Sequence, residues 1–247
     1  MKIHVINLAR HRHSILLISI LLVFIVLASA SVNMVTSILG DELFIESATA
    51  VPYDKIIILD AGHGGEDSGA VGSNGRLEKD LNLEMALEMG SCFEERGYIV
   101  VYTRTDDRLL YTEAENIKGI RKISDLKNRC KVAANYPKSI FVSIHMNSFG
   151  SSKYSGLQVY YKPEDDNSRV LADTIQQRVK SDVQPNNDRK IKSGNQMYVL
   201  ENVENTSVLI ECGFLTNSTE CKKLSEKEYQ KQLSFSIVCA IIDYIEN

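Results

Sequence analysis

The chain has little cysteine, and its cysteines form none of the usual motif spacings. It holds five cysteines in 247 residues, and none belongs to a Cys-x-x-Cys pair. This number is too low for a disulfide-rich scaffold, so the fold must rest on a hydrophobic core, for which 44% apolar residues provide ample material. Because five is an odd number, at least one cysteine of an exported protein would be unpaired or intermolecular.

An excess of positive charge is lacking too. The chain has 28 Lys and Arg against 32 Asp and Glu, a formal net charge of -4, and no basic stripe with interleaved aromatic residues. This composition argues against a nucleic-acid partner. A glycine-rich stretch surrounds His63, but no Gly-Lys-Ser/Thr follows it and its spacing is not a dinucleotide fingerprint, so a phosphate loop is disfavoured.

The N-terminus differs from the rest of the chain. Lys2, Arg10 and Arg12 precede an almost uninterrupted apolar run that extends to Val32. A positive segment followed by an apolar one is typical of a signal peptide, but the run is nearly as long as a membrane-spanning helix, which needs about 20 residues. We therefore expect residues 1–32 to contact the membrane as a cleaved signal or a retained anchor, and the remainder to be exported. Residues 33–51 are expected to form a tether, and residues 52–247 the catalytic domain.

Short β-branched runs alternate with longer segments of helical period from residue 56 onward. This alternation predicts an α/β fold, in which a twisted, mostly parallel sheet is flanked by helices on both faces of a single domain. The predicted strands are 56–59, 98–103, 140–144, 157–161, 197–200 and 207–210. The predicted helices are 77–96, 126–135, 168–183 and 226–245.

Three of the apolar runs end in, or just before, a side chain suited to metal binding or proton transfer. They lead to His63, His145 and Glu211. A buried strand delivers such a residue to the carboxyl edge of the sheet, where open α/β sheets bind their ligands. Any one of these runs alone would be an ordinary core strand, but the coincidence of three predicts an active site. Two histidines with carboxylates nearby indicate zinc.

A catalytic zinc usually has three protein ligands, so a carboxylate should join the two histidines. Glu66, Asp67 and Glu78 are the candidates near His63. Glu78 is the best placed, because it opens the helix after the glycine-rich loop and so points toward the end of the first strand. An acidic residue in a first helical turn also favours the helix dipole, and spacing alone leaves these two roles of Glu78 equally weighted. Glu211 is then available to move a proton.

Four segments together resemble the signature blocks of the zinc-dependent N-acetylmuramoyl-L-alanine amidases, the amidase_3 family. They are Asp60–Gly65, Glu78–Leu83, Ser143–Asn147 and Glu211–Asn217. The resemblance extends from Tyr53 to the C-terminus and includes a further block at Thr103–Asp107. It implies that His63, Glu78 and His145 bind Zn²⁺ and that Glu211 is the catalytic residue. The implied reaction is hydrolysis of the amide between the lactyl group of N-acetylmuramic acid and L-alanine of the peptidoglycan stem peptide.

Within this family the chain is most similar to the spore-cortex amidases, which act in muramic-δ-lactam formation and hence in germination. It has one catalytic domain without wall-binding repeats, and an expanded segment, residues 108–125. Met146 and Thr216 depart from the usual family blocks without removing a ligand. Several family members require an activating protein, and a site with three protein ligands can gain metal when a partner orders it, so an activating partner is also a hypothesis for this chain.

Two other functions fit some of these residues. The same zinc site could cut a peptide bond within the stem peptide, which would make the protein a peptidase. A cell-wall-binding protein with an inactive fold is the third alternative, and the presence of all four candidate residues argues against it.

Overall fold

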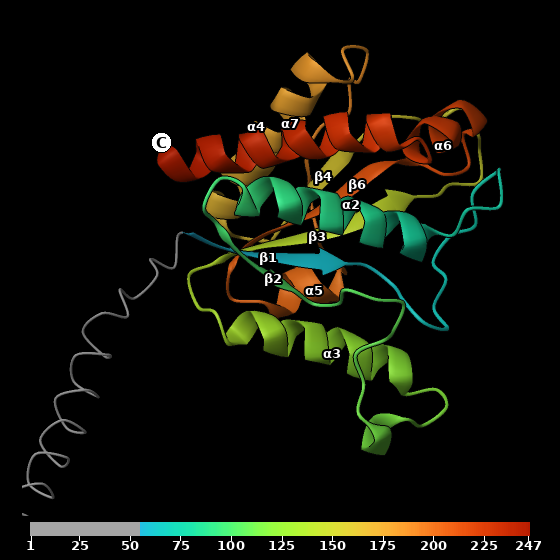
Figure 1. The fold of residues 1–247 in the computed structure, drawn as a ribbon, viewed down its shortest axis with the longest axis vertical. Helices are drawn as coiled ribbons and strands as arrows, with labels where there is room; N and C mark the ends of the chain where they lie inside the picture. Colours follow the sequence, from blue (N-terminus) through green and yellow to red (C-terminus); the bar gives the residue numbers. More distant parts are fainter. Residues whose placement is uncertain (1–54) are drawn as a thin grey trace, which may run out of the picture. The chain divides into compact units, whose positions relative to one another are not determined.

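The computed structural model describes residues 55–247, which form one α/β unit (Figure 1). The predictions for residues 1–32 and 33–51 lie outside the described residues. Within 55–247, no helix is long and apolar enough to cross a membrane. The strands are β1 Ile56–Ala61, β2 Ile99–Tyr102, β3 Ile140–Asn147, β4 Gln158–Tyr161, β5 Lys192–Ser193 and β6 Thr206–Phe214. The helices are α2 Glu78–Glu94, the 3₁₀ helix η2 Glu113–Glu115, α3 Arg121–Ala134, α4 Asp166–Asp182, α5 Tyr198–Asn202, α6 Ser218–Leu224 and α7 Lys227–Glu246.

The six strands form one sheet in the order β2-β1-β3-β6-β4-β5. The pairs β1–β2, β1–β3, β3–β6 and β4–β5 are parallel, and β4 runs antiparallel to β6. The prediction of a mostly parallel sheet is therefore confirmed. The three central strands β1, β3 and β6 consist almost entirely of buried residues, as expected for strands covered on both faces.

Helices cover both faces of the sheet, as the sequence predicted (Figure 1). One core cluster lies between the sheet and helices α2, α4 and α7, and includes Phe93, Ile175 and Ile237. A smaller cluster lies on the other face under α3 and α5, and includes Phe141 and Leu200. Successive residues of a strand supply opposite clusters, because their side chains alternate between the two faces.

The strand predicted at 197–200 is wrong, because Met197 is the N-cap of helix α5 and residues 198–200 belong to that helix. A run of four apolar residues does not distinguish a strand from one turn of helix. Val199, Leu200 and Val203 all pack into the smaller core cluster, and their i, i+1, i+4 spacing places them on one side of a helical turn. The short elements β5, η2 and α6 were not predicted, because they are too brief to show a period.

Candidate active site

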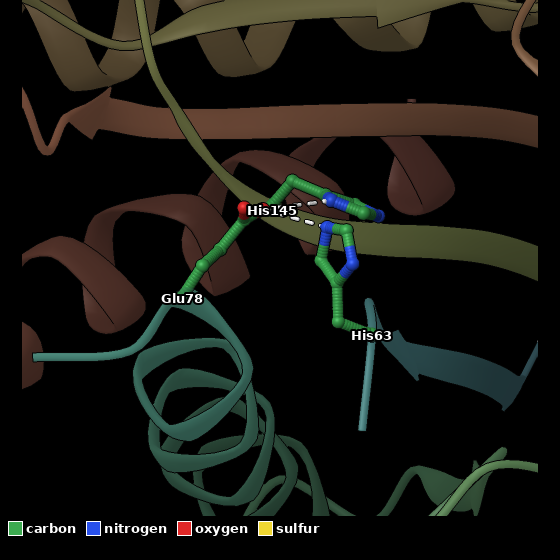
Figure 2. A group of neighbouring side chains, drawn as sticks. All are labelled: His63, Glu78 and His145. Atoms are coloured by element: carbon green, nitrogen blue, oxygen red, sulfur yellow. Dashed lines mark hydrogen bonds and ion pairs between the residues drawn. The ribbon is translucent and has the colours of Figure 1, made fainter. Parts of the chain in front are cut away.

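The carboxyl edge of the three central strands brings the predicted residues together. His63 follows β1, His145 lies near the end of β3, and Glu211 lies in β6. His145 and Glu211 are register partners in the parallel β3–β6 pair, so their side chains emerge side by side on the same face of the sheet. Glu78 is the first residue of α2 and approaches from the helix that covers the other face (Figure 2).

Three of the four residues form a compact donor cluster (Figure 2). His63, Glu78 and His145 each offer a ligand atom, and these atoms all lie within 4.8 Å of one another. Glu78 Oε1 lies 3.2 Å from His63 Nε2 and 3.0 Å from His145 Nδ1. Burial alone would raise the pKa of Glu78, but the two histidines outweigh it and hold this pKa well below its usual range. Glu78 is thus a carboxylate aimed at both imidazoles.

Backbone donors fix the carboxylate of Glu78. Its Oε2 accepts a hydrogen bond of 2.8 Å from the N–H of Ala70, and its Oε1 accepts one of 3.2 Å from the N–H of Met146. Gly69 permits this arrangement, because a Cβ at that position would lie 2.5 Å from Glu78 Oε2, and its φ of +62° is strained for other residues. The glycine-rich loop therefore closes over Glu78.

The other two carboxylates proposed near His63 have different surroundings. Asp67 Oδ2 lies 2.9 Å from His63 Nδ1 and 3.1 Å from Lys122 Nζ. This contact occupies the far side of the imidazole ring and leaves Nε2 facing Glu78, an arrangement that orients metal-binding histidines. Glu66 is half exposed and pairs with Arg121. Of the three candidates, Glu78 alone takes part in the donor cluster found within residues 55–247.

Glu211 differs from Glu78 in its electrostatics. Burial raises the pKa of Glu211 to about 7, against the opposing influence of the nearby His145 and His63. Its Oε2 is buried and has no hydrogen-bond partner among the described residues. A carboxyl group with a pKa near neutrality can both accept and donate a proton at physiological pH.

Two buried arginines, not predicted from the sequence, hold the backbone around His63. Arg129 of α3 donates to the carbonyl oxygens of Ala61 and His63, at 2.7 and 2.8 Å. Arg104 donates to the carbonyl oxygens of Ala61 and Gly62, both at 2.9 Å. His63 itself has a φ of 61°, the left-handed region that costs non-glycine residues energy. The arginines therefore stabilise a strained turn that presents a candidate ligand.

Asp60 completes this support from inside the sheet. It accepts hydrogen bonds from Arg129 Nη1 and Ser143 Oγ, both at 2.6 Å, and from Thr103 Oγ1 at 2.8 Å. Burial alone would raise the pKa of Asp60, but Arg129 and the two hydroxyl groups lower it overall. Its position at the end of β1 is visible in the sequence, but its partners come from three distant segments.

We expect Asp60→Asn to lower the free energy of unfolding at pH 7 by about 3 kcal/mol, because it leaves Arg129 partly unpaired in the core. An acid whose folded pKa lies below its unfolded value stabilises the fold above the unfolded pKa, here 3.8, and loses this contribution as pH falls through the folded value. The difference between variant and wild type should therefore shrink below about pH 4. Urea unfolding followed by circular dichroism at several pH values measures it.

The matched control is Asp188→Asn, which removes an exposed partner of Lys180. It should leave the stability near that of the wild type, because exposed ion pairs contribute little. Equal stabilities of Asp60→Asn and wild type at pH 7 would contradict the role given to the Asp60–Arg129 pair.

Comparisons with known proteins identify relatives of the whole described unit. The Amidase_3 family, described as N-acetylmuramoyl-L-alanine amidase, matches residues 57–243. The germination-specific N-acetylmuramoyl-L-alanine amidase of Bacillus subtilis is 37% identical over 190 residues, which cover 77% of this chain and 79% of that protein. Among solved structures, the CwlD amidase of Clostridioides difficile in complex with the GerS lipoprotein is 40% identical with a TM-score of 0.74. That match covers 77% of this chain and 98% of the CwlD chain. The catalytic domain of CwlV from Bacillus (Paenibacillus) polymyxa is 35% identical with a TM-score of 0.65, over 77% and 98% of the two chains.

Proposed function

Because this chain belongs to the Amidase_3 family and is a cell-wall N-acetylmuramoyl-L-alanine amidase, we propose that it is an exported zinc enzyme of the spore cortex. The amide that it cleaves joins the lactyl group of N-acetylmuramic acid to L-alanine of the stem peptide. The observation that carries the proposal is the convergence of His63, Glu78 and His145 beside Glu211 at one sheet edge.

The donor set fits zinc. Two imidazole nitrogens and one carboxylate oxygen converge within 4.8 Å, and this is the ligand chemistry of catalytic zinc sites, which leave a further position for water or substrate. We propose that His63, Glu78 and His145 are the ligands. Zinc held by them would polarise the amide carbonyl and lower the pKa of the attacking water.

Glu211 is proposed as the group that moves the proton. Its carboxylate would accept a proton from the water that attacks the carbonyl carbon, and would then pass this proton to the amine nitrogen as the C–N bond breaks. Burial raises its pKa to about 7, which suits both halves of this cycle. Its buried Oε2 has no hydrogen-bond partner among the described residues, so no other contact competes for this atom.

The spore-cortex assignment rests on the relatives. The Bacillus subtilis protein is named germination-specific, and the C. difficile structure is a CwlD amidase. We propose that this chain likewise removes stem peptides from cortex muramic acid, so that muramic-δ-lactam can form. Export to the space between forespore membranes would follow from the positive and apolar N-terminal sequence, with residues 1–32 as signal or anchor, 33–51 as tether and 52–247 as catalytic domain.

A protein partner is part of the proposal, because the CwlD relative was solved with the GerS lipoprotein. The segment 108–125 offers a physical route for activation. Its residues Arg121 and Lys122 pair with Glu66 and Asp67, and Asp67 in turn contacts His63. A partner that orders this segment would tighten the site. Equal zinc affinity with and without spore-envelope extract would contradict this part of the proposal.

Mass spectrometry of the fragments released from defined peptidoglycan tests the function. We expect zinc-loaded protein to release intact stem peptides that begin with alanine, and chelated protein to release none. Cleavage within the stem would make the protein a peptidase instead. No release despite bound zinc would indicate a missing activator or a need for cortex-specific substrate.

A further inference from the structure

A cavity of about 580 Å³ lies between the segment before β4, the loop after α4, and helix α6. Its volume lies within the range of ordinary ligand sites. Side chains that lock its walls together include Gln184, which accepts from the N–H of Leu157 at 2.8 Å and donates to Tyr229 Oη at 2.9 Å. Asn187 also donates to the carbonyl oxygen of Leu157, at 2.8 Å. The cavity is thus built by a fixed hydrogen-bond network.

Arg189 connects this cavity to the catalytic edge. It lines the cavity, and its Nη1 donates to Gln158 Oε1 at 3.4 Å. Gln158 is the register partner of Glu211 in the antiparallel β4–β6 pair, so the two side chains emerge on the same face, with Cβ atoms about 5 Å apart. A substrate at Glu211 that extends along the edge toward β4 therefore meets Arg189.

The cations of the cavity lie against aromatic rings. Arg189 Cζ lies 4.3 Å from the ring centroid of Phe214, and Lys153 Nζ lies 5.2 Å from that of Tyr154. Lys223 Nζ lies 6.0 Å from the ring centroid of Tyr229. None of these three cations has an ion-pair partner within 4.0 Å among residues 55–247. Their charges remain available to a ligand.

The acidic groups of the cavity have other partners. Glu220 is buried, and its two oxygens accept hydrogen bonds from the N–H groups of Gly156 and Phe214, at 2.8 and 2.7 Å. Asp188 pairs with Lys180 outside the cavity. Burial raises the pKa of Glu220, and the nearby charges of Arg189 and Lys223 oppose that rise, but its oxygens are held by backbone N–H groups and form no ion pair with either cation.

The opposite end of the catalytic edge, near the glycine-rich loop, has a different charge pattern. There Glu66 pairs with Arg121 at 2.6 Å, Asp67 with Lys122 at 3.1 Å, and Asp107 with Lys79 at 2.7 Å. An anionic part of the substrate gains little from a surface whose charges are already paired. It is attracted instead to the end that holds unpaired cations.

Building on the proposed function, we infer that this cavity is the peptide end of the substrate cleft, where Arg189, with Lys153 and Lys223, binds free carboxylates of the stem peptide. Arg189 is positioned for this, because it lies over the Phe214 ring and its bonds to Ser155 and Gln158 use Nε and Nη1, which leaves Nη2 for a carboxylate oxygen. The glycan then lies toward the glycine-rich loop. The cavity thereby makes the enzyme selective for stem peptides whose carboxylates are not amidated.

Binding of the released peptide tests this inference without turnover. The full chain, in detergent and zinc-loaded, is titrated calorimetrically with two stem peptides that differ only in free or amidated carboxylates. A charge-assisted contact of this kind should make the free form bind about 10- to 100-fold more tightly. Arg189→Gln should reduce the difference, whereas Arg169→Gln, which changes an exposed arginine on α4, should preserve it. Equal affinities of wild type for the two peptides would overturn the inference.

Kinetic measurements on the corresponding muramyl-peptides test the role of the cavity separately from the proposed function. Arg189→Gln should raise KM for the free substrate by a larger factor than KM for the amidated substrate, and should change kcat less than KM. An equal loss on both substrates would indicate a merely structural role, since Arg189 Nε also donates to the carbonyl oxygen of Ser155. The double variant Lys153→Gln/Lys223→Gln should show the same selective loss. It tests the inference independently if Arg189→Gln does not fold. Selective peptide binding would support the cavity whether or not this protein cleaves alone, whereas cleavage with equal binding of the two peptides would support the function and contradict the cavity.

Discussion

Replacing Glu211 by glutamine is expected to lower kcat by about 10²- to 10⁴-fold while zinc remains bound. Glutamine has the size of glutamate and fits the same buried position, but it cannot accept a proton from water. Glu211 also lies outside the donor cluster of His63, Glu78 and His145, so its loss should leave the metal in place. Turnover of a soluble muramyl-peptide and zinc content by atomic spectrometry measure the two effects separately.

The metal-free variant should also be more stable than metal-free wild type at neutral pH. Burial raises the pKa of Glu211 to about 7, so ionising it in the folded protein costs energy that the unfolded chain does not incur. An acid with a raised folded pKa loses stability as pH rises from its unfolded value, 4.5, to about 7, and glutamine removes this loss. Higher stability with lower activity would show that the fold retains a costly carboxylate for the reaction.

Glu88→Gln is a suitable control, because it also replaces a glutamate by glutamine but lies in the second half of α2, away from Glu78 at the start of the helix. It should leave kcat, zinc content and stability near wild type. An empty metal site in Glu211→Gln would move Glu211 into the ligand set, and wild-type turnover would exclude it as the proton-transfer group.

The sequence predicted those parts of the fold that depend on local pattern. Strands β1, β3 and β6 are continuous apolar runs, and α2, α4 and α7 show clear helical period, so all six were located within a few residues. α3 begins five residues before its predicted start, because Arg121–Asp125 has little apolar content to reveal a period. The prediction of a strand in place of α5 failed because a run of four apolar residues fits the period of a strand as well as that of a helix.

The candidate site was predictable to the extent that strand ends determine it. His63, His145 and Glu211 could be placed at one edge because each follows or ends a buried run. The choice between Glu66, Asp67 and Glu78 depended on how the glycine-rich loop folds back, and no periodicity encodes that. In the structure the N–H groups of Ala70 and Met146 donate to Glu78 and to neither of the others, and Glu78 alone of the three lies in the donor cluster.

The residues that hold the backbone around His63 could not be predicted either, because their contacts join distant segments of the chain. Asp60, Arg104 and Arg129 occur in separate segments, and they meet only because β2 and α3 both pack beside β1. A buried arginine in an amphipathic helix looks like an exposed one until its partners are known. The signal available was the charged residue at the end of a buried strand, Asp60, which requires a partner somewhere in the chain.

Alanine at His63 or at His145 is expected to remove zinc and activity together. Each substitution leaves two of three protein donors, so the dissociation constant of zinc should rise by more than about 100-fold. This exceeds the usual effect of removing a residue that only hydrogen-bonds to a ligand. Asp67→Asn provides that comparison, because Asp67 contacts the far nitrogen of His63 and lies outside the cluster. Its effect on zinc affinity should be about 10- to 100-fold.

The order of these effects decides the ligand set, with competition against a fluorescent chelator as the measurement and circular dichroism to confirm folding. If His63→Ala and His145→Ala both exceed Asp67→Asn, the three converging donors of Figure 2 hold the metal. If Asp67→Asn removed zinc while His145→Ala retained it, the metal would lie on the outer side of His63, between the imidazole and Lys122. That location is electrostatically poor, because the ammonium group of Lys122 lies 3.1 Å from the Asp67 oxygen. We therefore expect the inner cluster to bind zinc and Asp67 to orient His63.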